Sequence, residues 1–371
     1  MNSQFLEEIS NDVQPALDAI VGLADLLLDM QLPEEQRSYV EAIQRSGQDL
    51  AHTLSSVLDF ARLQSGNFVP GFYPFNLRVA IEETLERFAS EARERRTELT
   101  HYLSTNGSDV FLADGQRIGQ ILTHLVGDAV NRTIGGEIYL EGHRYNEADR
   151  CLIYLSVHDN GMALPPGLIQ ELNTSNSRKD QLEAALQHAG HFSLFVSRVM
   201  VNQMGGDIWF ESSPEHGTIV TLTVAAQVDQ TIKPADPRQC LALFENKTVL
   251  VVDDSATGRE VLRRQLEAWC MRPIMAESAS VALHLLQPGS RFDIVLIDEV
   301  LEDMDGITLA AAIRHREELD GTPLILLGKS KDIDPRYWRL FTTSVDKPFR
   351  AHQLYERLRA TLQGNSTKNY Y

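Results

Sequence analysis

The sequence has few cysteines, no long apolar run and an excess of acidic side chains. Its three cysteines, Cys151, Cys240 and Cys270, form no CxxC pair and have no histidine at metal-ligand spacing, which argues against a disulfide framework and a zinc site. No stretch approaches the roughly 20 apolar residues that cross a bilayer, and the N-terminus has no secretory pattern, so we expect no transmembrane segment and a cytoplasmic location. The net charge of −18 argues against nucleic-acid binding, because phosphate contacts need clustered Lys and Arg.

What is present is a globular composition, with 371 residues of which 43% are hydrophobic and 23% charged, enough for two or three domains. In residues 1–66, two apolar runs at helical spacing flank "MQLPEEQ", which predicts a helical hairpin whose wide apolar stripe suits a homodimeric four-helix bundle. Residues 72–226 mix helical and strand patterns without regular alternation and predict an α+β two-layer sandwich. Residues 227–246 indicate a polar linker, and residues 364–371 a tail.

Residues 247–363 show five short β-rich runs, each followed by an amphipathic helical stretch, which predicts a five-stranded, doubly wound parallel α/β sheet. Asp253 and Asp254 end the first run, Asp298 ends the third and Lys347 follows the fifth, so they should meet at one sheet edge. Such a cluster suits Mg²⁺, with one carboxylate acting as a nucleophile toward phosphorus. The alternative is that these aspartates only cap helices; four matched positions favour the chemical interpretation.

These motifs, "VLVVDDS", "DIVLIDEVLEDMDG" and "DKPF", resemble those of the response-regulator receiver family in order and spacing. The resemblance implies that Asp253, Asp254 and Asp298 hold Mg²⁺, that Asp298 accepts phosphate and that Lys347 contacts it. Two positions depart from the family. Gly328 stands where receivers have Thr or Ser, and Ser344 stands where an aromatic side chain is usual, so we expect phosphorylation without the usual conformational switch.

The N-terminal part resembles the catalytic core of a hybrid histidine kinase, through "PFNLRVAIEETLERFASEARERR", "DGQRIGQILTHLVGDAV" and "MGGDIWFESSPEHGTIVTLTV". The family's phosphorylation motif is close to "SHEIRTPL", and this chain reads "SNDVQPAL". Asn11 stands at the histidine position, and its carboxamide is not nucleophilic enough to accept phosphate. Asp12 keeps the acidic neighbour, but Pro15 replaces the residue that positions water for dephosphorylation.

The nucleotide motifs also differ from the family pattern. Asp128 stands at an asparagine position and could still bind Mg²⁺. In "DNGMAL", Asp159 would bond the adenine amino group, and Gly161 is kept. The later glycine-rich motif is "AGHFSLFV", which lacks glycines that let backbone N–H groups approach phosphates, so ATP binding is doubtful. We assign no chemistry to His124, His188 or His191.

The sequence therefore predicts a two-component phosphorelay protein, a hybrid histidine kinase that lacks its phosphoacceptor histidine and regulates as a pseudokinase or scaffold. Its receiver would accept phosphate from a partner. The expected partners are a second copy, other histidine kinases, phosphotransfer proteins or response regulators. Two alternatives stay open: an active kinase or ATPase with an unconventional site, and a receiver that acts as a phosphate sink.

Overall fold

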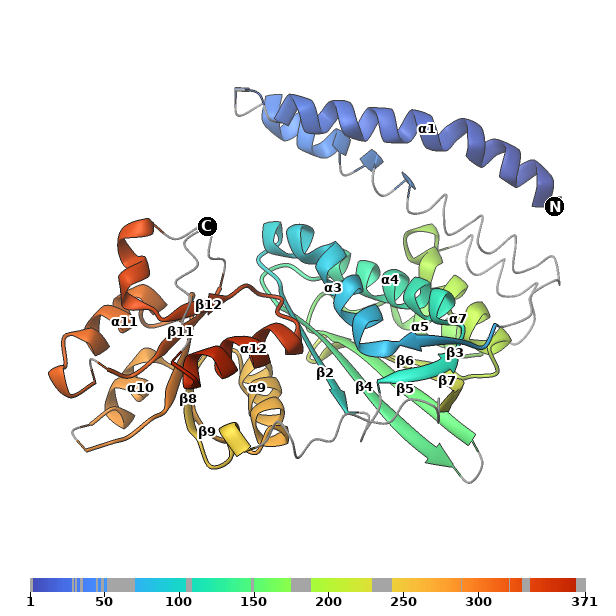
Figure 1. Cartoon of the computed structure of the whole chain (residues 1–371). Coiled ribbons are helices and arrows are strands. Elements are labelled where there is room, and N and C mark those ends of the chain that lie inside the picture. Colours follow the sequence, from blue (N-terminus) through green and yellow to red (C-terminus); the bar gives the residue numbers. More distant parts are fainter. Residues whose placement is uncertain are drawn as a thin grey trace. The chain divides into compact units, whose positions relative to one another are not determined.

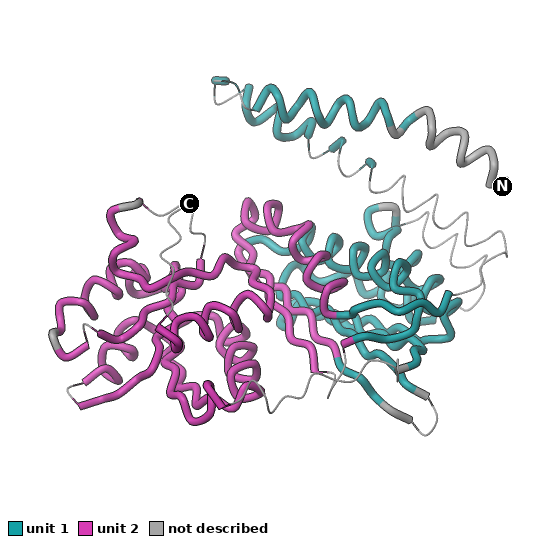
Figure 2. The backbone as a smooth tube through the Cα atoms, viewed as in Figure 1, with its two compact units in different colours: residues 1–77, 110–134, 143–229 teal, residues 78–109, 135–142, 230–371 magenta. Residues whose placement is uncertain are grey.

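The computed structural model (Figure 1) divides into two compact units, which Figure 2 colours separately. Unit 1 comprises residues 1–77, 110–134 and 143–229, and unit 2 comprises residues 78–109, 135–142 and 230–371. The residues that the structure describes are 3–28, 30, 32–33, 36–44, 46–47, 50–51, 71–104, 109–147, 150–174, 188–228, 242–287, 289–319, 321–328 and 334–364.

Unit 1 combines a long N-terminal helix with an antiparallel sheet that is covered on one face by helices (Figure 1). Its helices are α1 (Ser3–Leu28), α4 (Gly115–Arg132), α5 (Pro166–Thr174), the short 3-10 helix η1 (Ala189–His191) and α7 (Phe192–Gln203). Its strands are β1 (Tyr73–Asn76), β3 (Val110–Ala113), β5 (Arg150–Asp159), β6 (Ile208–Ser213), β7 (Gly217–Val228) and the end of β4 (Glu137–Glu147). The strand order is β1-β3-β7-β5-β4, and β6 pairs with residues 217–222 of β7.

Local signals explain where α4 starts and which face it buries. Asp114 caps the helix, because its side chain accepts a hydrogen bond from the Arg117 N–H at 3.1 Å. Residues such as Ile118, Ile121 and Leu125 recur at helical spacing and are buried. The helix ends at Arg132, while the β5 and β7 register pairs Asp159 with Thr218. These positions prepare a polar cluster that is described below.

Helix α1 corresponds to the first helix of the predicted hairpin and contains Pro15 in its interior. Residues 36–44 are helical as well, in agreement with a second helix after Pro33. The last part of the hairpin, residues 52–66, and most of the predicted linker lie outside the described residues. Several large apolar side chains of these two helices are exposed: Ile20, Leu23, Leu26, Leu27, Tyr39, Ile43 and Leu50.

Unit 2 contains a parallel sheet with helices on both faces, together with a helix and two strand segments from earlier in the chain (Figure 2). The earlier elements are α3 (Leu77–Glu94), β2 (Glu98–Ser104) and the start of β4, which pairs with β2. The parallel sheet has the order β12-β11-β10-β8-β9, with strands β8 (Thr248–Val252), β9 (Arg272–Ala276), β10 (Ile294–Asp298), β11 (Leu324–Leu327) and β12 (Thr343–Val345). Its helices are α9 (Ala256–Ala268), α10 (Ala279–Leu285), α11 (Gly306–Arg314), η2 (Glu317–Leu319), η4 (Pro335–Leu340) and α12 (Ala351–Leu362).

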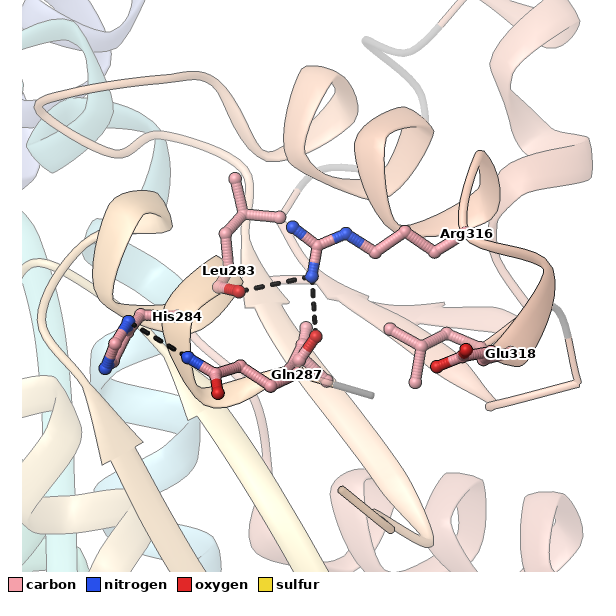
Figure 3. Close-up of a pocket in the computed structure, with 7 residues that line it drawn as sticks. Leu283, His284, Gln287, Arg316 and Glu318 are labelled. Carbon is pink, nitrogen blue, oxygen red and sulfur yellow. Dashed lines mark hydrogen bonds between the residues drawn. The ribbon is translucent and has the colours of Figure 1, made fainter. Parts of the chain in front are cut away.

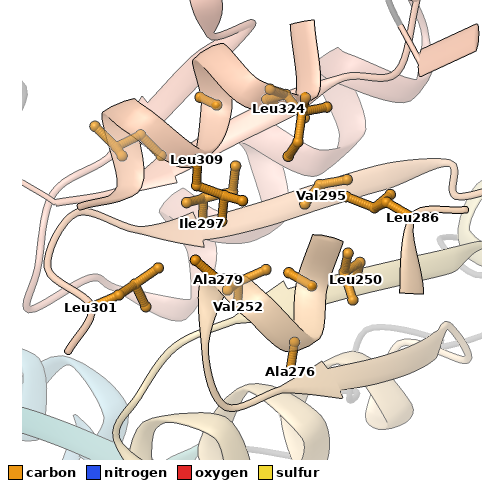
Figure 4. Close-up of a cluster of buried hydrophobic side chains, with 14 of the residues drawn as sticks. Leu250, Val252, Ala276, Ala279, Leu286, Val295, Ile297, Leu301, Leu309 and Leu324 are labelled. Atoms are coloured by element: carbon orange, nitrogen blue, oxygen red, sulfur yellow. The ribbon is translucent and has the colours of Figure 1, made fainter. Parts of the chain in front are cut away.

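Alternation along the central strands builds two cores, one on each face of the parallel sheet. Leu250, Val295 and Leu324 face the core made with α10 and α11, which Figure 4 shows. Their chain neighbours face the other core, which α9 and α12 complete. Successive side chains of a strand point to opposite faces, so a strand that is buried on both faces reads as a continuous apolar run. This is why "TVLVV" and "IVLID" were recognisable as strands.

The predicted elements and the observed ones differ at short segments. The expected helices near 78–96, 115–131 and 193–204 and the five strands of the parallel sheet are present. The sequence did not indicate β1, β2, β3 or α5, because strands of four to seven residues carry too few positions for a clear pattern. An amphipathic helix was expected after the fourth strand of the parallel sheet. The described residues there form only η4, which begins at Pro335.

Candidate functional site

Three predicted residues of unit 2 meet at the carboxyl edge of the parallel sheet. Asp253 follows β8, Asp298 ends β10 and Lys347 follows β12. The Lys347 Nζ atom lies 3.1 Å from Asp253 Oδ2 and 3.0 Å from Asp298 Oδ2. Asp254, the neighbour of Asp253, is half-buried. The parallel strands therefore bring together two carboxylates and one ammonium group that are far apart in the sequence.

Backbone groups fix the orientation of both carboxylates. Asp253 Oδ1 accepts a hydrogen bond from the Ser255 N–H at 2.8 Å, and Asp298 Oδ1 accepts one from the Glu299 N–H, also at 2.8 Å. In each case the second oxygen, Oδ2, is left to face Lys347. The site is thus held in place by the loops that follow β8 and β10.

Burial and neighbouring charges shift the pKa values of the ionisable groups at this site. Burial raises the pKa of Asp298 to about 7, and the nearby carboxylates of Asp253 and Glu98 add to the rise, while Lys347 opposes it. Burial alone would lower the pKa of Lys347, but the surrounding carboxylates raise it above its ordinary value, so the side chain is an ammonium ion. Burial and the Asp253 charge also raise the pKa of Asp254.

The carboxylates fit a hard divalent cation. One oxygen from each of Glu98, Asp253 and Asp298 lies within 4.8 Å of the others, and Mg²⁺ prefers oxygen ligands of this kind. The sequence did not point to Glu98, which begins β2 and stands 249 positions before Lys347. Lys347 donates a hydrogen bond to Glu98 Oε1 at 2.6 Å, shorter than its distances to the two aspartates.

Of the two positions that depart from the receiver pattern, one lies directly after β11 and the other within β12. Gly328 follows β11, and its N–H bonds the Val345 carbonyl oxygen at 2.9 Å. A Cβ atom at Gly328 would lie 2.5 Å from the Cβ and 2.3 Å from an Oε of Glu299, so this position has no room for a side chain. Ser344 lies within β12, opposite Leu326 of β11.

A second polar cluster lies in unit 1, at the end of α4. Arg132 Nε donates to Asp128 Oδ2 at 2.8 Å, and its two terminal nitrogens donate to Asp159 Oδ1 and Oδ2 at 3.0 and 2.8 Å. The same guanidinium also donates to the Met162 carbonyl and the Thr218 hydroxyl. The side chains of all three charged residues are at most 9% exposed. Arg132 therefore bridges the two aspartates that the sequence proposed for nucleotide binding.

His191 completes this cluster from η1. Its Nδ1 atom lies 2.9 Å from Asp128 Oδ1, so a histidine to which we assigned no chemistry has a carboxylate partner in the structure. Burial would raise the pKa of Asp128, but hydrogen bonds from His191 and Arg132 lower it below its ordinary value. For Asp159, burial outweighs the Arg132 charge and raises the pKa.

The backbone around Asp159 requires a glycine at the predicted position. The Gly161 N–H donates to Asp159 Oδ1 at 3.0 Å. A Cβ atom at Gly161 would lie 2.6 Å from the Arg132 carbonyl oxygen. Gly161 is therefore needed for the close approach of this loop to the end of α4. The sequence did not single out Arg132, because a basic residue in the last turn of a helix ordinarily only complements the helix dipole.

The altered phosphorylation motif lies on α1. Asn11, Asp12 and Pro15 are all within this helix. The side chains of Asn11 and Asp12 lie outside the described residues, whereas that of Pro15 is exposed.

A cavity of unit 2 lies apart from these clusters, between α10 and η2 (Figure 3). It has a volume of about 650 Å³ and is lined in part by His284, Arg316 and Glu318. The Arg316 guanidinium donates to the backbone carbonyls of Leu283 and Leu286 and so serves to join these segments.

Comparison with protein families assigns each part of the chain. Residues 1–66 match the His Kinase A (phospho-acceptor) domain. Residues 113–228 match the histidine kinase-, DNA gyrase B- and HSP90-like ATPase family, and residues 249–359 match the response regulator receiver domain. The chain has the three-domain organisation of a hybrid histidine kinase. The predicted fold class, a helical region, an ATPase-type α/β domain and a five-stranded receiver, is confirmed.

Individual relatives of this hybrid histidine kinase support the assignment. Sensor histidine kinase AruS of Pseudomonas aeruginosa is 31% identical over 360 residues, which cover 95% of this chain and 36% of the relative. Probable histidine kinase 3 of Oryza sativa is 26% identical over 98% of this chain and 41% of the relative. The chain thus spans about two fifths of these proteins.

A solved structure shares the fold. Full-length ShkA in complex with AMPPNP has a TM-score of 0.69 and 22% identity, and the match covers 97% of this chain and 72% of that one. Among the described residues, every helix is too short or too polar to span a membrane.

Proposed function

We propose that this hybrid histidine kinase is a pseudokinase, which regulates a two-component pathway through protein binding and through a receiver that a partner phosphorylates at Asp298. Asn11, at the phosphoacceptor position, removes the nucleophile that histidine would supply. The receiver keeps its two buried aspartates and its lysine in contact. Phosphate would therefore enter from another histidine kinase or phosphotransfer protein.

The observation that carries the loss of kinase activity is the guanidinium of Arg132. It engages both oxygens of Asp159, the residue that would accept the adenine amino group, and shares Asp128 with His191. A nucleotide would have to displace a buried, bidentate ion pair. Separating a buried ion pair costs about 3–5 kcal/mol, or about two to four orders of magnitude in affinity.

The receiver chemistry follows from the geometry of its site. An Asp298 oxygen would attack the phosphorus of a partner's phosphohistidine, and the imidazole would leave with the electron pair of the broken P–N bond and take up a proton. Lys347, 3.0 Å from Asp298 Oδ2, would bond a phosphoryl oxygen. Asp253, Asp254 and Asp298 would hold Mg²⁺, which supplies charge neutralisation to the phosphoryl group.

The partner surface of the hairpin is its exposed apolar face. Leu23, Leu26 and Ile43 are each more than half exposed. Burying such side chains against a second copy would make the four-helix bundle that the sequence pattern predicts. We expect Ile43→Lys to convert a dimer into monomers in sedimentation equilibrium, whereas Gln36→Lys, at an exposed polar position of the same helix, should leave the dimer intact. A monomeric parent chain would contradict this part of the proposal.

Titration with nucleotide tests the pseudokinase assignment. Calorimetry with ATP and Mg²⁺ should give no binding at sub-millimolar concentration, and incubation with labelled ATP should leave the chain unlabelled. ATP-dependent labelling of the purified protein would instead establish an active kinase with an unconventional site. Binding without labelling would keep the scaffold role but make it nucleotide-dependent.

A small phosphodonor tests the receiver. Acetyl phosphate with Mg²⁺ should phosphorylate the wild-type chain and not Asp298→Ala, as measured by intact mass. Equal labelling of both proteins would remove Asp298 from the mechanism. Rapid loss of the label after removal of the donor would favour the role of a phosphate sink.

A further inference from the structure

Glu98 lies at the phosphorylation site of unit 2, but the receiver chemistry proposed above gives it no role. It starts β2, within the segment 78–109 that packs with the receiver in one compact unit. Its carboxylate takes the shortest hydrogen bond of Lys347, at 2.6 Å, and lies within 4.8 Å of the carboxylates of Asp253 and Asp298. Three carboxylates, two from the receiver and one from β2, thus share one ammonium group.

A phosphoryl group on Asp298 and the Glu98 carboxylate compete for the same donor. Lys347 has three N–H groups, and in the structure they face Glu98, Asp253 and Asp298. Phosphorylation replaces the carboxylate charge of Asp298 by a phosphoryl group that carries about −1.5 to −2, which increases the negative charge beside Glu98, and like charges in a buried site repel. The space lined by Glu98, Asp253 and Lys347 is about 20 Å³, room for a single water molecule.

Other contacts near Lys347 also join an acidic side chain of the earlier segments to a donor of the receiver. Arg350 donates to Glu86 of α3, and the Ala351 N–H at the start of α12 donates to Glu82 at 3.1 Å. On α9, Arg264 bonds Glu141 of β4 at 2.9 Å. Arg264 also lies over the ring of Tyr102, 5.4 Å from its centroid. The segments 78–109 and 135–142 contribute the acids and the receiver contributes the bases, so the two surfaces are electrostatically complementary.

We propose that Glu98 is a built-in blocker of the phosphorylation pocket, so that docking of the receiver on the segment 78–104 and phosphorylation of Asp298 oppose each other. The proposal rests on the phosphorylation of Asp298 proposed above. The coupling is reciprocal. If docking lowers the equilibrium constant of phosphorylation by some factor, phosphorylation lowers the equilibrium constant of docking by the same factor. Phosphorylation would then release the receiver surface from the segment 78–104. This release would not need the Thr or Ser hydroxyl that receivers have at the position of Gly328.

The rate of phosphorylation tests the blocker in the full chain. With acetyl phosphate and Mg²⁺, Glu98→Gln should be phosphorylated about tenfold faster than wild type, as expected for loss of one charge-assisted hydrogen bond. Glu94→Gln, at an exposed position of α3, is the matched control and should keep the wild-type rate. Equal rates for Glu98→Gln and wild type would overturn the inference and leave the proposed function standing. Slower phosphorylation would place Glu98 in the cation site and also overturn it. No labelling of wild type or variants would sink the proposed function itself.

A charge swap separates docking from a local effect on Asp298. Arg350→Glu lies outside the carboxylate cluster and should also accelerate phosphorylation, and Arg350→Glu combined with Glu86→Arg should return the rate toward that of wild type. An unchanged rate in Arg350→Glu would contradict docking. Beryllium fluoride, a phosphoryl mimic, should increase amide hydrogen exchange at residues 99–103 in wild type and not in Asp298→Ala. Unchanged protection in wild type would contradict release.

Discussion

At the scale of single residues, Arg132 supplies the counter-charge of the two aspartates that we propose for the nucleotide site. Its guanidinium satisfies both oxygens of Asp159 and one of Asp128, a geometry that suits the planar fork of arginine and not the point charge of lysine. The two aspartates were identified from the sequence. Their partner, Arg132, was not identified, because the local sequence pattern does not show which arginine side chain is buried against a carboxylate.

Replacing Arg132 should destabilise unit 1. Arg132→Ala leaves the buried Asp159 carboxylate without its guanidinium partner and Asp128 with only His191, and we expect a loss of about 3–5 kcal/mol in the free energy of unfolding. Arg132→Lys should recover part of that loss. Urea unfolding followed by circular dichroism measures it, with Gln116→Ala, exposed on the same helix, as the control. A loss in Arg132→Ala no larger than in the control would show that the bridge does not form in solution.

Gly328 gives a second prediction at this scale. Because a Cβ atom there would overlap the Cβ of Glu299, Gly328→Thr should lower the free energy of unfolding by about 1–3 kcal/mol. At Gly321 an added Cβ has no heavy atom within 4 Å, so Gly321→Thr is the matched control. Thermal unfolding of the two variants compares them. Equal stability would mean that Glu299 moves freely and that the switch hydroxyl can be restored by one substitution.

At the scale of elements, the buried strands were the most predictable part of the molecule. β8, β10 and β11 are apolar on both faces, so each can be recognised in the sequence as a short continuous run of apolar residues. The first three strands of the chain were not predicted, since strands of four to seven residues carry too few positions for a clear pattern, and in β1 most side chains are exposed. Their position is set by pairing with distant strands such as β7.

The starts of β8 and β10 are tied together by Asp293, which carries a pH dependence. Burial would raise the pKa of Asp293, but hydrogen bonds from Lys247 at 2.9 Å and the Thr248 N–H at 2.8 Å lower it. A depressed pKa stabilises the fold above the unfolded-state value of about 3.9, and the contribution disappears as the pH falls through the folded-state value. Because the pair is partly exposed, we expect only about 1 kcal/mol.

The measurement compares urea unfolding of wild type and Asp293→Asn between pH 7 and pH 3. The stability difference should be present at pH 7 and shrink as the pH falls below about 4. Glu318→Gln, exposed on η2, should show no such trend. A difference that grows toward low pH would contradict the assigned direction of the pKa shift.

At the scale of the whole molecule, the proposed losses lie in separate parts of the chain. Asn11 is on α1, Arg132 is at the end of α4, and Gly328 is in the receiver. Repair of one cannot compensate for the others, since phosphotransfer needs an acceptor and a bound nucleotide together. Asn11→His alone should therefore give no autophosphorylation with labelled ATP. Labelling of Asn11→His would show that the nucleotide site works and would reverse the pseudokinase proposal.

The sequence by itself determined the receiver sheet and the meeting of Asp253, Asp298 and Lys347 at its edge, and it places an asparagine, Asn11, at the position that we propose for the phosphoacceptor. These features depend on local periodicity, strand ends and residue identity, all of which can be read along the chain. Only the tertiary structure decided which charges neutralise the buried carboxylates. Arg132 reaches Asp159 across 27 positions and Glu98 reaches Lys347 across 249, and long-range ion pairs of this kind follow from how elements pack. They leave no periodic signal in the sequence.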